Sequence, residues 1–82
     1  MQQYSYTPVG VCSRKIEFAM EDGILHDVRF TGGCHGNLKA IGKLLEGTEA
    51  RRAAEILRGN TCGVRSTSCA DQLARAIDEA LR

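Results

Sequence analysis

The chain has 82 residues, of which 43% are hydrophobic and 26% charged, and a formal net charge of +1. This length allows one domain, residues 1–82, whose hydrophobic core alone is barely large enough to stabilise it. A net charge near zero gives no broad field that would attract nucleic acid or a membrane, so neither is expected as a partner. The sequence opens without a basic and apolar leader and lacks a run of roughly 20 apolar residues, which predicts a cytoplasmic protein.

Alternating hydrophobicity predicts strands in the first part of the chain. Spaced apolar residues over 4–9 suit a first strand, which Pro8 restricts to a sheet edge. Apolar and polar residues alternate over 15–20 and again over 25–30, and Glu21-Asp22-Gly23 supplies turn chemistry between them. The pattern therefore predicts a β-hairpin preceded by an edge strand.

After the hairpin the apolar residues change to helical spacing. A first helix is predicted from Asn37, as N-cap, to a stop at Gly47, and a second over 49–58 with Thr48 as its cap. Ser68 followed by Asp71 has the form of a capping box for a last helix. This order predicts an α+β fold, with an antiparallel sheet of about three strands followed by three helices packed on one face. The other face would suit a homodimer.

The four cysteines, Cys12, Cys34, Cys62 and Cys69, each fall near a predicted element boundary. Core cysteines are expected on apolar stripes inside elements, so this placement indicates that loops carry all four to one site. In a reducing compartment, thiolates persist for metal or redox chemistry more than for structural disulfides. Four thiolates satisfy tetrahedral Zn²⁺ or an iron–sulfur cluster. The first functional hypothesis is a non-enzymatic metal-binding module.

Other interpretations of the cysteines stay open. The spacings lack the Cys-x-x-Cys knuckles of common zinc folds, and some of the four could be buried and inert. Cys62 and Cys69 could form a reversible disulfide, which would make the chain a thiol-disulfide redox protein. No paired-carboxylate or Ser–His–Asp pattern is present, so an enzyme is not indicated.

A glycine-rich turn, Gly32-Gly33-Cys34-His35-Gly36-Asn37, leads into the first predicted helix. Such a turn at a helix N-terminus can hold a phosphate, which gives a second hypothesis of a flavin- or nucleotide-binding or carrier domain, with Lys39 and Arg65 as candidate charges. His35 could serve as a ligand, a general base or only a surface group. A plain strand-to-helix connection explains the glycines equally simply.

The segment Thr67-Ser68-Cys69-Ala70-Asp71, with the glycine turn and Leu38 upstream, resembles the TSCPD-domain family, specifically its small stand-alone four-cysteine branch. The resemblance covers nearly the whole chain. The family is described with a presumed metal-binding role, so the resemblance implies metal binding. Related domains occur at the C-terminal end of cobalamin-dependent ribonucleotide reductases, which implies a link to such a reductase or to a protein that accepts the metal or cofactor. Ala70 replaces the usual proline, and alanine also fits a first helical turn.

A fainter likeness is to iron–sulfur scaffold proteins of the IscU type. It lies in 30–34, in 38–47 and in Ser68-Cys69-Ala70. This likeness implies an IscU-like order of elements and ligand cysteines at Cys34 and Cys69.

Overall fold

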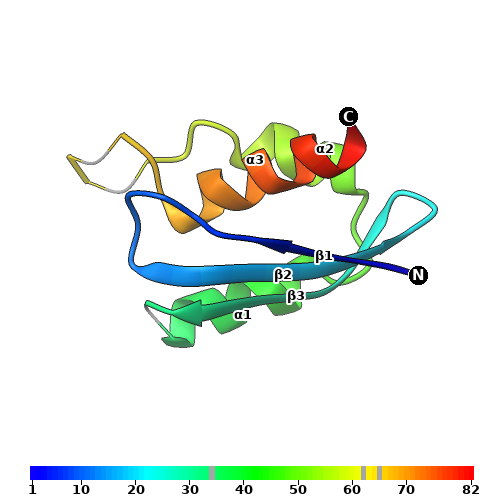
Figure 1. Ribbon diagram of the computed structural model, residues 1–82, viewed down its shortest axis with the longest axis horizontal. Helices are drawn as coiled ribbons and strands as arrows, with labels where there is room; N and C mark the ends of the chain where they lie inside the picture. Colours follow the sequence, from blue (N-terminus) through cyan, green and yellow to red (C-terminus); the bar gives the residue numbers. More distant parts are fainter. Residues whose placement is uncertain (34, 62, 65) are drawn as a thin grey trace.

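Three strands followed by three helices make up the chain, and the computed structural model describes residues 1–33, 35–61, 63–64 and 66–82. The elements are β1 (Gln2–Tyr6), β2 (Ser13–Glu21), β3 (Ile24–Gly32), α1 (His35–Leu45), α2 (Ala50–Leu57) and α3 (Cys69–Leu81). The strands form one antiparallel sheet in the order β1-β2-β3. Figure 1 shows α2 and α3 together over the strands and α1 alongside β3. The predicted α+β arrangement is confirmed.

A two-residue turn joins β2 to β3. Asp22 and Gly23 both have positive φ, at 53° and 79°, which is the backbone of the type I′ turn that matches the twist of a hairpin. Pairing of Met20 with Leu25 and of Ile16 with Phe30 then sets the register. The hairpin predicted from alternation and the turn sequence is therefore present.

A bulge in β3 fixes the end of α1. The register shifts opposite the Glu17–Ala19 stretch, and Asp27 adopts a φ of 52°. The Asp27 N–H donates to Glu46 Oε1 at 2.8 Å, and His26 Nδ1 lies 2.6 Å from Glu46 Oε2. The Asp27 N–H, followed by His26, holds the pKa of the Glu46 carboxyl below its ordinary value. These contacts hold the end of α1 against β3.

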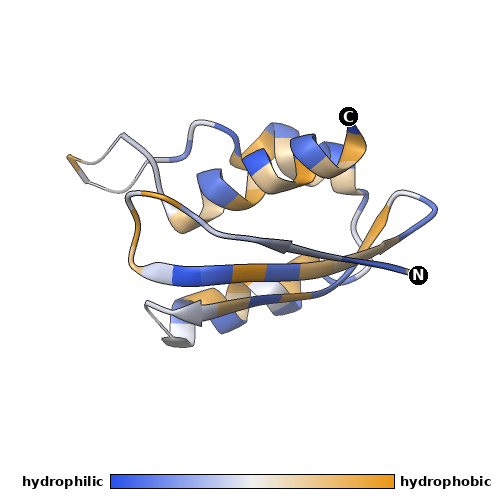
Figure 2. Ribbon diagram, in the orientation of Figure 1, coloured by the Kyte–Doolittle hydropathy of each residue, from blue (hydrophilic) through white to orange (hydrophobic). Residues whose placement is uncertain are grey.

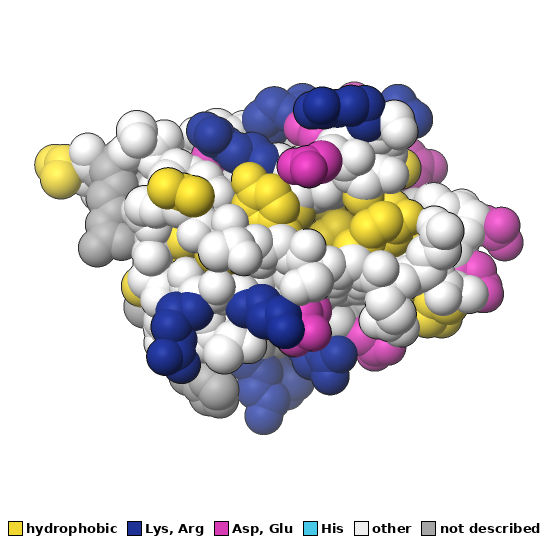
Figure 3. Space-filling view, in the orientation of Figure 1, with side chains coloured by type: hydrophobic (Ala, Val, Ile, Leu, Met, Phe, Trp, Pro, Cys, Tyr) yellow, Lys and Arg dark blue, Asp and Glu magenta, His cyan; other side chains and the backbone are white. Residues whose placement is uncertain are grey.

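The core lies between the sheet and the paired helices. Ile16, Phe18 and Met20 alternate along β2 and face Leu73 and Ile77 of α3, and all five are buried. Figure 2 shows this layer as orange segments of strand and helix that face each other. At its border Figure 3 shows hydrophobic side chains gathered between β1 and α3, with charged groups above and below. This packing fixes α3, and with it the cysteine that opens α3.

Two predicted helix caps are wrong. Asn37 lies inside the first turn of α1, which begins at His35. Glu49, not Thr48, is the N-cap of α2 and has no side-chain cap; the Thr48 hydroxyl instead donates to the Leu45 carbonyl at 2.7 Å. The start of α1 moves by three residues, from Leu38 to His35, and the cap of α2 moves by one. Within the described residues, no helix is both long and apolar enough to cross a membrane.

Candidate functional site

Two of the four cysteines lie side by side. Cys12 ends the loop before β2, and Cys69 is the first residue of α3, 57 positions later in the sequence. Their Sγ atoms are 3.8 Å apart, which is far beyond the roughly 2.05 Å of a disulfide bond. Cys12 is exposed, whereas Cys69 is buried. We call these two side chains the thiol pair.

A buried hydroxyl supports the thiol pair. Ser13, the first residue of β2, is only 3% exposed, and its Oγ lies 3.1 Å from the Cys69 Sγ. Either atom can be the donor. Oxygen–sulfur contacts of this kind orient a cysteine and stabilise its thiolate when the hydroxyl donates.

Gly33 makes room for the other sulfur. Its φ is 74°, and a Cβ placed on it would lie 2.8 Å from the Cys12 Sγ and 3.2 Å from the Leu38 Cδ1. No other residue type fits this position without moving the thiol pair. The glycine turn therefore contacts the site by its backbone, directly before Cys34 in the sequence.

A pocket of about 310 Å³ opens beside the thiol pair. Four parts of the chain border it: the loop before β2, α1, the segment after α2 and the start of α3. The lining residues are Val11, Cys12, Asn37, Leu38, Ile41, Asn60, Thr61, Ser68, Cys69 and Ala70. Of the four cysteines predicted to converge, the structure brings Cys12 and Cys69 together at this pocket.

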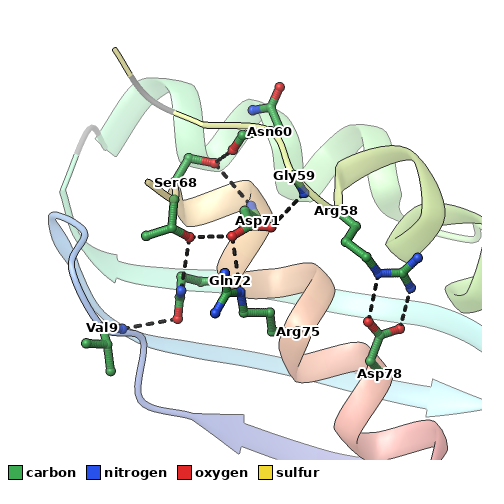
Figure 4. Close-up of polar contacts among 10 residues, drawn as sticks. Val9, Arg58, Gly59, Asn60, Ser68, Asp71, Gln72, Arg75 and Asp78 are labelled. Carbon is green, nitrogen blue, oxygen red and sulfur yellow. Dashed lines mark hydrogen bonds and ion pairs between the residues drawn. The ribbon is translucent and has the colours of Figure 1, made fainter. Parts of the chain in front are cut away.

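Hydrogen bonds fix the start of α3 (Figure 4). Ser68 is the N-cap: its Oγ accepts from the Asp71 N–H at 3.1 Å and donates to the Asn60 carbonyl. The capping half of the predicted box is therefore confirmed. Because the Ser68 hydroxyl also holds Asn60, the two ends of the loop between them are tied together beside the pocket.

The Asp71 carboxylate ties together three segments. It is 2% exposed and accepts from the Thr67 hydroxyl, from the Gly59 N–H at 2.7 Å and from Arg75 Nε at 3.2 Å. The Thr67 hydroxyl, followed by the Gly59 N–H, holds the pKa of this carboxyl below its ordinary 3.8. A capping box would return this side chain to the Ser68 backbone, but here it holds the end of α2.

Gln72 extends the network to the first loop. Its Nε2 donates to Thr67 Oγ1 at 3.0 Å, and its Oε1 accepts from the Val9 N–H at 3.1 Å, as Figure 4 shows. The loop that carries Cys12 is thus attached to the helix that carries Cys69. Sequence inspection missed Gln72 and Ser13, because each stands next to a charged residue, Asp71 and Arg14, and so gives no local signal of burial.

Several predicted site residues cannot be compared with the structure. Cys34, Cys62 and Arg65, as well as the His35 side chain, lie outside the described residues. Gly36 and Asn37 form the first turn of α1, and only Asn37 borders the pocket. Among described side chains, no group of three or more His, Cys, Asp and Glu residues could hold a metal ion.

The sequence comparison gives one family. The model of the TSCPD domain matches residues 1–81. The chain belongs to the TSCPD-domain family. The motif that gives the family its name is Thr67-Ser68-Cys69-Ala70-Asp71 in this chain. It has a clear structural role, because Thr67, Ser68 and Asp71 form the network that presents Cys69 at the pocket. No curated protein and no solved structure matched the chain, so the IscU likeness stays a prediction.

Proposed function

We propose that this TSCPD domain is a small metal-binding module in which Cys12, Cys34, Cys62 and Cys69 coordinate Zn²⁺ or an iron–sulfur centre. The observation that carries the proposal is the 3.8 Å between the sulfurs of the thiol pair. A tetrahedral ion with zinc–sulfur bonds of about 2.3 Å separates its thiolates by about 3.8 Å. The pair therefore has the spacing of two corners of a thiolate tetrahedron.

The same spacing favours particular centres. Two thiolates this close can share one metal ion, as in a zinc site or at one iron of a [2Fe–2S] cluster. In a [4Fe–4S] cluster each cysteine binds a different iron, which spreads the thiolates further apart. The spacing thus supports zinc or a two-iron cluster over a four-iron cluster.

The chain next to the other two cysteines supports the four-ligand proposal. Gly33, which precedes Cys34, lies against the Cys12 sulfur, and Thr61, which precedes Cys62, borders the same pocket. A pocket of about 310 Å³ is at the lower limit of ligand pockets, which favours a metal centre over a flavin or nucleotide. Coordination would also stabilise a domain whose core is small.

Elemental analysis tests the proposal. Protein purified without a metal-affinity tag is expected to contain close to one metal centre per chain, and Cys69→Ser should weaken binding about a hundredfold, since four ligands share the binding free energy. Ser66→Ala is the control: it removes an exposed hydroxyl near Cys69 in the sequence that is not a proposed ligand, and it should bind the metal normally. Metal-free protein with four thiols that titrate freely would contradict the proposal.

A thiol-disulfide couple is the second candidate, and the same short distance favours it. The partner of Cys69 would be Cys12 instead of the predicted Cys62, because the two described sulfurs need to approach by less than 2 Å to bond. Glutathione disulfide would take two electrons and two protons from the pair and leave as two glutathione thiols. Mass spectrometry across a glutathione titration should then find a bridge between residues 12 and 69; a pair that stays reduced throughout would exclude this function.

A further inference from the structure

The Ser13 hydroxyl contacts one sulfur among the described residues, that of Cys69. Ser13 is 3% exposed, so water does not compete for its hydroxyl. Its one hydrogen-bond partner among the described residues is the Cys69 Sγ, at 3.1 Å. Ser13 also follows Cys12 directly, so the junction between the first loop and β2 carries one thiol of the pair and contacts the other.

Protonation decides which atom donates. A cysteine that binds a metal is a thiolate, which has no proton to give. In that state the hydrogen bond can only run from the Ser13 hydroxyl to the Cys69 sulfur. Hydrogen bonds to a charged acceptor are about twice as strong as neutral ones, and the burial of Ser13 preserves that strength.

We propose that Ser13 is a positioning residue for the thiol pair: its hydrogen bond to Cys69 Sγ holds that sulfur 3.8 Å from Cys12 before a metal arrives, and the hydroxyl is the donor once that sulfur is a metal-bound thiolate. The inference rests on the proposed function in treating the pair as ligands. Because the sulfurs already stand at chelating distance, binding does not have to include the cost of bringing them together. Ser13 thus acts through Cys69 and does not touch the metal.

Phenylarsine oxide, a trivalent arsenical that bridges two thiolates, measures this pre-organisation without a metal. In the full reduced chain, with Cys34 and Cys62 replaced by serine, the thiol pair is the only dithiol. Ser13→Ala should weaken arsenical binding by about ten- to a hundredfold, the effect of losing a hydrogen bond to a charged group. Ser13→Thr, which keeps a hydroxyl, should restore most of the affinity. Ser5→Ala removes an exposed hydroxyl of β1 and should change nothing.

Each outcome decides a separate question. Equal arsenical affinity in the parent, Ser13→Ala and Ser13→Thr would overturn the role of Ser13, and so would a Ser13→Thr chain as weak as Ser13→Ala. Should Ser13→Ala fail to fold, Ser13→Val is compared with Ser13→Thr, which has nearly the same shape and keeps the hydroxyl: weaker arsenical binding by Ser13→Val is expected, and equal affinity in the two would overturn the role of Ser13. Loss of arsenical binding in Ser13→Ala, together with wild-type protein that contains no metal, would support Ser13 and refute the metal site.

Discussion

Replacing Asp71 with alanine is expected to lower the free energy of unfolding by about 3 kcal/mol and the Tm by about 15 °C. The substitution removes the acceptor of the Thr67 hydroxyl and of the Gly59 N–H and leaves these donors unpaired beside a buried site. Asp78→Ala on the same helix is the matched control. It breaks only the exposed ion pair with Arg58, which is worth about 0–1 kcal/mol. Equal losses in the two variants, measured by thermal unfolding, would contradict the role given to Asp71.

The pH dependence follows from the lowered pKa of Asp71. The unfolded chain takes up the proton near the ordinary 3.8, whereas the folded chain takes it up at lower pH. The stability that the Asp71 carboxylate contributes is therefore complete above pH 3.8, and it is lost as the pH falls through the pKa of Asp71 in the folded chain. The stability difference between wild type and Asp71→Asn should shrink as the pH falls below about 4. A difference that stays constant or grows would show that the carboxylate charge is not what matters.

Replacing Gly33 with alanine is expected to weaken metal binding at least about tenfold and to destabilise the fold by about 2–5 kcal/mol. Part of the cost, about 1–2 kcal/mol, comes from placing an L residue at positive φ. The rest is overpacking, of about 1–3 kcal/mol, since the new Cβ would lie 2.8 Å from the Cys12 sulfur. Isothermal titration with Zn²⁺ and thermal unfolding of the metal-free chain would measure the two effects.

Gly47→Ala separates backbone strain from contact with the site. Gly47 has a φ of 79°, close to that of Gly33, but a Cβ there meets nothing within 4 Å. Gly47→Ala should therefore lose about 1–2 kcal/mol of stability and keep its metal affinity. If both variants bind metal alike, Gly33 is a turn residue with no part in placing Cys12.

Sequence patterns predicted the parts of the fold that depend on local chemistry. The Asp22-Gly23 turn and the alternation of Ile16, Phe18 and Met20 are signals of short range, and the hairpin formed as predicted. The third helix was equally clear, because Ser68 at its start and Leu73 and Ile77 on its stripe agree with one another. The Asn37 cap failed because α1 already begins at His35, and the Thr48 cap failed because the Thr48 hydroxyl bonds back to Leu45 and leaves Glu49 as the extended residue before α2.

The site was predictable only in outline. Cysteines near element boundaries indicated convergence, and Cys12 and Cys69 do meet, but no local pattern could have paired residues 57 positions apart. The roles of Asp71 and Gln72 depend on where α2 and the first loop come to lie, which packing decides. Family resemblance supplied what spacing could not, since the TSCPD match identified the motif that carries Cys69.

X-ray absorption at the metal edge of protein purified without added metal tests the central claim most directly. The proposal predicts about one zinc or iron centre per chain with a shell of sulfur neighbours at about 2.3 Å, four per zinc ion, and loss of that shell in Cys12→Ser. Cys12 and Cys69 would be two of the ligands, at the separation they already have. A chain without metal, or a metal surrounded by oxygen and nitrogen only, would contradict it.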